Sequence, residues 1–198
     1  LFVKTLKSGR ATAMTGVNTL FNGLLNTPGF AELDFSRMKF AIGGGTAVQR
    51  AVAEKWKQVT RTRLIEGYGL TESSPVACAN PLDGEYNGTI GLPLPSTEAR
   101  IVADDGRVLP LYDGKRPMEE CTGEICIRGP QVMKGYWKRD DETAQAITPD
   151  GFLKTGDVGH MDLRGYVTIS DRKKDMILVS GFNVYPNEIE DVLAGHPG

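Results

Sequence analysis

Long apolar runs and an excess of charge of either sign are both missing from the sequence. No stretch approaches the ~18–20 apolar residues that a membrane-spanning helix requires, and the chain does not begin like a signal peptide. The 23 lysines and arginines nearly balance 25 aspartates and glutamates, for a formal net charge of -2. This balance gives no electrostatic reason to expect nucleic acid as a partner. We therefore expect a globular cytoplasmic protein that does not bind nucleic acid.

Cysteine and histidine are also scarce. Cys78, Cys121 and Cys126 are an odd number without metal-like spacing, and only His160 and His196 could join them. Such a set favours reduced thiols in a cytosolic protein over a disulfide or a zinc site.

The two ends of the sequence favour a fragment of a longer polypeptide. The chain starts at Leu1 instead of a methionine, and it stops at Gly198, just after a segment with the pattern of a helix start. Such a stop suits a turn that leads into further protein.

The first part of the sequence alternates between helix and strand patterns. Apolar residues recur at helical spacing over residues 11–26, and short apolar strands are predicted over residues 38–42 and 63–65. Both strands run into glycine-containing turns, where ligands of α/β proteins bind. Residues 1–86 are therefore predicted to be the C-terminal part of an α/β layered subdomain.

A helix is predicted after the first glycine turn. Thr46 and Gln49 have the spacing of a capping box, in which each side chain serves an orphan backbone amide. Val48, Val52 and Trp56 share one face of this helix and are expected to face the core.

The second part of the sequence has short strand patterns and frequent turns. Apolar and polar residues alternate over residues 98–102, 124–128 and 166–170, which fits antiparallel strands with one buried face. A small antiparallel β-barrel-like subdomain is therefore predicted over residues 87–173. Residues 174–198 are predicted to be a hinge and the start of a small α+β C-terminal domain.

One segment, residues 66–72, combines the groups that a nucleotide site needs. Its glycines let the backbone approach a ligand, the ring of Tyr68 can stack on a base, and the hydroxyl of Thr71 can bind a phosphate oxygen. The carboxylate of Glu72 can hold Mg²⁺ beside the phosphates. The same residue types also occur in plain turns and helix starts, so both interpretations stay open on these residues alone.

Two later segments carry charged candidates. Asp157, in the sequence Thr-Gly-Asp, could accept both hydroxyls of a ribose, although such an aspartate more often forms a turn. Arg172, in the charged segment 171–175, could bind ribose or phosphate oxygens, although such a segment is usually a solvated, exposed connection.

In this order, the segments resemble the motifs of the AMP-forming adenylate family, which comprises acyl-CoA synthetases, luciferases and peptide-synthetase adenylation domains. Residues 68–72 resemble its adenine and magnesium motif, residues 155–157 its ribose motif, and residues 171–177 with 180–181 its hinge motif. Residues 123–129 with Gly135-Tyr136 resemble the motif in between. Residues 150–174 are similar to the fatty acyl-CoA synthetase signature, and residues 179–190 resemble the bacterial long-chain enzymes in particular.

The resemblance implies a two-step reaction and a role for each matched residue. A fatty acid and ATP form an acyl-adenylate and pyrophosphate, and CoA then takes the acyl group and releases AMP, with Mg²⁺ as cofactor. Catalysis is assigned to Thr71, which binds the α-phosphate, and to Glu72, which binds Mg²⁺. The implied nucleotide-binding residues are Gly43, Gly44, Gly45, Glu66, Gly67, Tyr68, Gly69, Thr71, Asp157, Ile169 and Arg172. Lys174 matches the hinge and Gly181 the glycine beside which the pantetheine of CoA passes.

The sequence also departs from the family pattern. Many relatives have Ala-Pro after the glycines where this chain has Thr46-Ala47, which affects the expected wall of the acyl pocket. The phosphate-binding loop is not found, and Lys173 and Lys174 do not match the adenylation lysine, so the chain alone is predicted to be inactive. Gly135-Tyr136-Trp137 is expected to pack the barrel.

Several alternatives stay open. The acyl substrate could be another carboxylic acid, the acceptor could be a carrier protein, or the chain could be a non-catalytic nucleotide-binding module. A homodimer, and peripheral association of the parent protein with the inner membrane, are equally open.

Overall fold

The structure, a computed structural model, describes residues 2–8, 10–172, 177–179 and 182–184. The chain divides into two compact units: Leu1–Thr71 with Pro75–Leu92, and Glu72–Ser74 with Pro93–Gly198. The domain boundaries predicted after residues 86 and 173 stay predictions.

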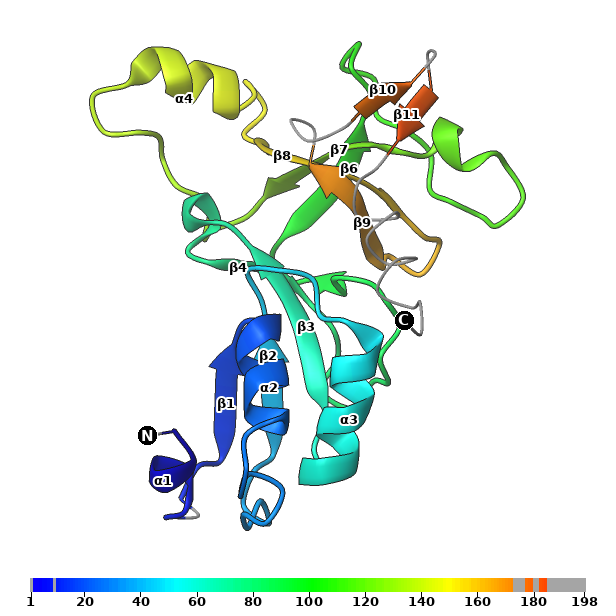
Figure 1. The fold of residues 1–198 in the computed structure, drawn as a ribbon. Helices are drawn as coiled ribbons and strands as arrows, with labels where there is room; N and C mark the ends of the chain where they lie inside the picture. Colours follow the sequence, from blue (N-terminus) through cyan, green and yellow to red (C-terminus); the bar gives the residue numbers. More distant parts are fainter. Residues whose placement is uncertain (1, 9, 173–176, 180–181, 185–198) are drawn as a thin grey trace. The chain divides into compact units, whose positions relative to one another are not determined.

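The first unit is the expected α/β layer. Its elements are α1 (Phe2–Leu6), β1 (Ala13–Gly16), α2 (Asn18–Leu25), β2 (Phe40–Gly43), α3 (Arg50–Thr60), β3 (Leu64–Gly69) and β4 (Val76–Ala79). Strands β1, β2 and β3 pair in parallel, β4 pairs with β3 antiparallel, and β5 (Leu92–Pro93) lies next to β4 in the five-stranded sheet. Helices α2 and α3 run beside the parallel strands (Figure 1).

The core of this unit lies between α2 and α3. The rings of Phe21 and Trp56 meet edge to face with their centroids 4.9 Å apart, and Phe30 packs on the same tryptophan. Val52 and Trp56 are buried on one face of α3, as their spacing predicted, and Val48 is buried as well although it precedes the helix. Aromatic pairs of this geometry stabilise a fold beyond the area that they bury.

The helix predicted over residues 11–26 is wrong in its first half. Residues Ala13–Gly16 form strand β1, which pairs in parallel with Phe40–Gly43, and only Asn18–Leu25 is helical. Met14 and Val17 fit a helical spacing, but a short segment of this kind also pairs as a strand when a sheet edge is available.

The predicted capping box is wrong as well. Helix α3 begins at Arg50, and its N-cap residue Gln49 makes no side-chain capping bond. Side chains distant in sequence serve the amides before the helix instead: the Val48 N–H donates to Glu66 (3.2 Å) and the Gln49 N–H donates to Asn18 (3.1 Å).

The second unit is rich in antiparallel strands, as expected. Its elements are β6 (Glu98–Val102), η2 (Met118–Glu120), β7 (Gly123–Arg128), α4 (Asp140–Ala146), β8 (Leu153–Met161), β9 (Val167–Arg172), β10 (Ile177–Val179) and β11 (Phe182–Val184). Strands β6 to β9 form one antiparallel sheet in chain order, and β10 pairs with β11 (Figure 1). The α/β layer followed by a β-rich part is thus confirmed.

The charged segment 171–175 was predicted to be an exposed connection between strands; Arg172 is exposed, but the first two residues lie in a strand and not in a connection. Asp171 and Arg172 belong to β9 and pair with Val158 and Asp157 of the nine-residue strand β8. The long partner strand extends the ladder into the charged segment.

None of the helices in the described part of the chain has the length and apolar character needed to cross a bilayer. All three cysteines are buried, and none of them forms a disulfide.

Replacing Phe21 by alanine should lower the free energy of unfolding by about 3–5 kcal/mol, because the ring is fully buried and leaves a cavity beside Trp56. Urea unfolding followed by tryptophan fluorescence measures this change. The control Val17→Ala alters an exposed side chain and should change stability by less than about 0.5 kcal/mol. Equal effects of the two substitutions would contradict the described core.

Candidate nucleotide site

The residues predicted to bind the nucleotide are divided between the two units. The first unit carries Gly43, Gly44, Gly45, Glu66, Gly67, Tyr68, Gly69 and Thr71, and the second carries Glu72, Asp157, Ile169 and Arg172. The predicted hinge residue Lys174 and the predicted CoA-tunnel residue Gly181 lie outside the described residues.

In the first unit, the glycine turn and the strand β3 come together as the sequence predicted. Gly43, the last residue of β2, pairs with Glu66 of β3. A Cβ atom added to Gly44 would lie 3.0 Å from the carbonyl oxygen of Gly67, and Gly45 has a φ of +78°, which disfavours other residues. These glycines allow the two backbone segments to approach closely and leave a surface without side chains at the end of β2.

Gly67, Tyr68 and Gly69 lie in a strand, and the predicted glycine turn at this position is wrong. They complete β3 and pair antiparallel with β4, with a register shift between Tyr68 and Gly69. Gly69 packs so closely on the carbonyl of Pro75 that a Cβ atom would collide with it. Tyr68 is half-buried opposite Cys78, and the exposed Thr71 begins the 3₁₀ helix η1 (Thr71–Ser73).

The carboxyl of Glu66 differs strongly from an ordinary glutamate. Burial raises the pKa of its carboxyl to about 7, against the opposing effect of the hydrogen bond that it accepts from the Val48 N–H. The hydroxyl of Tyr86 donates to the carbonyl oxygen of the same Val48 (2.9 Å). The backbone N–H and the backbone carbonyl of Val48 are therefore both hydrogen-bonded to side chains from other parts of the chain. The sequence did not indicate Tyr86, since a lone tyrosine in a loop carries no pattern.

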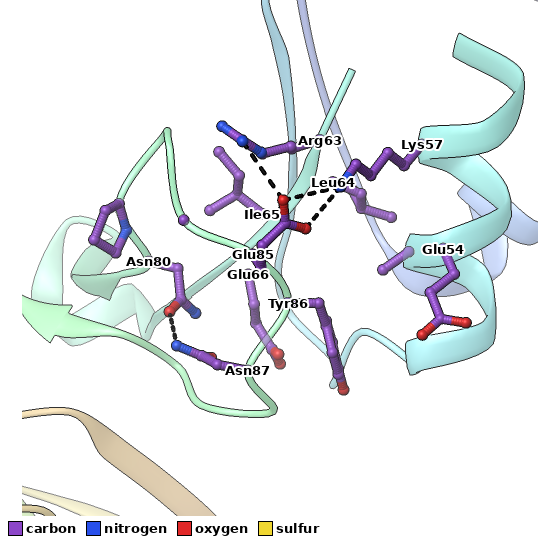
Figure 2. Close-up of a pocket in the computed structure, with 13 residues that line it drawn as sticks. Glu54, Lys57, Arg63, Leu64, Ile65, Glu66, Asn80, Glu85, Tyr86 and Asn87 are labelled. Carbon is purple, nitrogen blue, oxygen red and sulfur yellow. Dashed lines mark hydrogen bonds and ion pairs between the residues drawn. The ribbon is translucent and has the colours of Figure 1, made fainter. Parts of the chain in front are cut away.

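Glu66 also faces a small cavity between α3, β3 and the loop of residues 80–87 (Figure 2). At its edge, Lys57 (2.8 Å) and Arg63 (3.6 Å) form ion pairs with Glu85. The cavity measures about 50 Å³, whereas sites for small organic ligands occupy roughly 300–1,000 Å³. It is therefore too small to be the site of a nucleotide or an acyl chain.

In the second unit, Asp157 and Arg172 are brought together across the β8–β9 pair. They occupy opposite register positions, and the Arg172 Nε atom lies 3.5 Å from the Asp157 Oδ1 atom. The aspartate side chain is 9% exposed and the arginine side chain 58%. Ile169 lies on the same strand as Arg172, opposite Gly159, and is half-buried. The two residues of the predicted ribose pair thus form an ion pair between the middle of β8 and the last residue of β9.

Glu72 accepts a hydrogen bond from Tyr136, a residue that the sequence predicted to pack in the barrel. The hydroxyl of Tyr136 donates to its Oε1 atom at 2.8 Å, and this bond raises the pKa of Tyr136. The expectation that Gly135-Tyr136-Trp137 packs the barrel is wrong, because Tyr136 is 36% and Trp137 86% exposed. A loop can hold these aromatic residues at the surface when a polar contact compensates for the missing burial.

The residues present fit Mg²⁺ bound mainly by substrate and water. Glu72 offers a half-buried carboxylate beside a hydrogen-bond donor, and the described residues contain no cluster of three or more His, Cys, Asp or Glu side chains. Mg²⁺ usually keeps several waters and takes one or two protein carboxylates beside phosphates.

Stability should depend on pH through Glu66. Its pKa is about 7 in the fold against an ordinary value of 4.5, so the folded state holds a proton that the unfolded state releases between these values. The free energy of unfolding should therefore fall as the pH rises from about 4.5 to about 7, by at most about 3 kcal/mol. Urea unfolding at pH 5 and pH 7.5 measures this difference.

Glu66→Gln is the matched variant, since its amide oxygen can still accept the Val48 N–H bond but does not titrate. Its stability should match that of wild type at pH 5, where Glu66 is protonated and neutral, and exceed that of wild type at pH 7.5, where wild type carries a buried charge. The same pH dependence in both proteins would show that Glu66 is not the group responsible.

The chain is similar to known proteins over nearly its whole length. It is 55% identical over 197 residues to a long-chain-fatty-acid–CoA ligase of Escherichia coli, covering 99% of this chain and 34% of that protein. It is 37% identical over 187 residues to the fatty acid–[acyl-carrier-protein] ligase ScoC of Streptomyces coeruleorubidus, and this match covers 92% of this chain and 34% of that protein. The chain thus spans about a third of the length of these relatives.

Solved structures have the same fold. ATP-bound MatB from Rhodopseudomonas palustris matches with a TM-score of 0.86 and 35% identity, over 99% of this chain and 38% of that one. The family model described as AMP-binding enzyme matches residues 1–137. The chain therefore belongs to the AMP-binding enzyme family.

Proposed function

We propose that the chain is a segment of an AMP-forming long-chain-fatty-acid–CoA ligase. The parent protein joins a fatty acid to ATP, giving an acyl-adenylate and pyrophosphate, and then transfers the acyl group to CoA and releases AMP. The observation that carries this proposal is the 55% identity over 99% of the chain to a ligase of that name.

The roles proposed in the first unit concern the base and the α-phosphate. The ring of Tyr68 stacks on adenine, while the bare backbone of Gly43 to Gly45 offers the other face and Glu66 and Gly67 lie near its edge. Thr71, whose side chain is exposed, donates its hydroxyl to the α-phosphate. Placing donors where charge develops on the phosphate is how a site of this kind accelerates the first step.

The roles proposed in the second unit concern the ribose and the metal. Asp157 accepts the ribose hydroxyls, and Arg172 both donates to the sugar and keeps the aspartate charged. Glu72 holds Mg²⁺, which neutralises charge on the phosphates when bound. Lys174 and Gly181 keep their proposed roles as hinge and CoA-tunnel residues on the motif alone.

A related activity is favoured by one relative. ScoC is a fatty acid–[acyl-carrier-protein] ligase, so the acceptor of the second step could be a carrier protein in place of CoA. Supplying the full-length protein with long-chain fatty acid, ATP and either acceptor, and measuring the thioester formed, distinguishes the two. If no thioester forms with CoA or with the carrier protein, both functions are contradicted.

The isolated 198-residue chain should form no AMP or pyrophosphate from ATP and fatty acid, because it lacks a recognisable phosphate-binding loop and adenylation lysine. A coupled pyrophosphate assay on the purified chain checks this, with a full-length ligase as the positive control. Turnover that depends on fatty acid would overturn the expectation.

Asp157→Ala in the full-length protein should weaken binding of a non-hydrolysable acyl-adenylate mimic by about 10- to 100-fold, since hydrogen bonds to a charged group contribute about 1.5–3 kcal/mol. Isothermal titration calorimetry measures this loss. Asp83→Ala, which changes an exposed loop aspartate, is the control and should bind like wild type. Equal affinity of all three proteins would contradict the ribose role.

A further inference from the structure

The segment between β7 and β8 reaches Glu72 through both its side chain and its backbone. The hydroxyl of Tyr136 donates to Glu72 Oε1 (2.8 Å), and the backbone N–H of Met133 donates to the carbonyl oxygen of Glu72 (2.8 Å). These residues belong to the same compact unit, although Tyr136 follows Glu72 by 64 positions. The backbone bond locates the residue and the side-chain bond sets the direction of the carboxylate.

Tyr136 is itself held by helix α4. The backbone N–H of Tyr136 donates to the hydroxyl oxygen of Thr143 (2.9 Å). The Thr143 hydroxyl in turn donates to the carbonyl oxygen of Arg139 (2.8 Å). Gly135 has a φ of +151°, and a Cβ atom added there would lie 2.7 Å from Thr143 Cγ2. The glycine therefore lets the loop pass close to Thr143, which accounts for the Gly-Tyr pair and for a threonine seven residues after the tyrosine.

The contact is not explained by packing. At 36% exposure the ring of Tyr136 is partly buried, but burial of the ring does not require a protein partner for its hydroxyl, which has water as an alternative. Ordering the ring restricts its rotation, which costs conformational entropy. The hydrogen bond and its support from α4 instead restrict how the Glu72 carboxylate can rotate.

We propose that Tyr136 is a positioning residue for Glu72, holding that carboxylate in the orientation that binds Mg²⁺, with Thr143 and Gly135 as its support. The inference rests on the role of Glu72 proposed above. A hydroxyl that donates to one carboxylate oxygen reduces the rotation of that carboxylate, so less order is lost when the metal binds. Such partners of metal-binding carboxylates typically change metal affinity by about 10- to 100-fold when mutated.

The test is Tyr136→Phe in the full-length ligase that contains this segment. Calorimetric titration of Mg²⁺ into the protein with a non-hydrolysable ATP analogue should show affinity at least about tenfold weaker. Adenylate formation should need correspondingly more Mg²⁺ and return close to the wild-type rate at saturating Mg²⁺. A loss of structure would not be restored by the metal.

Tyr112→Phe is the matched control, because it removes a hydroxyl from the same unit for which the described residues provide no hydrogen bond. The Tyr112→Phe protein should bind Mg²⁺ with the affinity of wild type. Thr143→Val, which loses the support of the Tyr136 backbone, should weaken Mg²⁺ binding in the same direction, and Thr143→Ser should restore it.

Two failures are distinguishable. A wild-type protein without Mg²⁺-dependent adenylation overturns the proposed function, and this inference with it. If the wild type is active, a Tyr136→Phe protein with unchanged Mg²⁺ dependence, or one whose loss persists at saturating Mg²⁺, overturns the positioning role alone.

Discussion

The close parallel pairing of β2 with β3 is the constraint on which the first half of the candidate site depends. Gly43 and Glu66 share a register position, and no side chain of Gly43 to Gly45 separates the turn from Gly67. The aromatic pair of Phe21 and Trp56 stabilises the helices beside these strands. Because the turn carries no side chains, its backbone and that of Gly67 can approach closely.

Three acids of the motifs lie in three different environments, and their chemistry differs accordingly. Burial raises the pKa of Glu66 to about 7, although the Val48 N–H bond that it accepts acts in the opposite direction. Asp157 is buried but paired with Arg172, which favours the charged form. Glu72 is half-buried and accepts a tyrosine hydroxyl.

The segment between β7 and β8 is ordered by hydrogen bonds although its aromatic residues are not buried in a core. Its residues Trp137 and Tyr136 are exposed, and its order comes from polar contacts to Glu72 and from Thr143 of α4. Loops positioned by a sheet commonly carry functional residues in this way.

The sequence by itself determined the family, the order of α/β layer and β-rich part, and strands such as Glu98–Val102, because glycine positions and alternating patterns are local signals. Only the tertiary structure decided that Ala13–Gly16 is a strand, that Thr46 and Gln49 form no cap, and that Tyr136 contacts Glu72. The physical reason is the same in each case. A partner distant in sequence supplies the pairing or the hydrogen bond, and local periodicity carries no information about that partner.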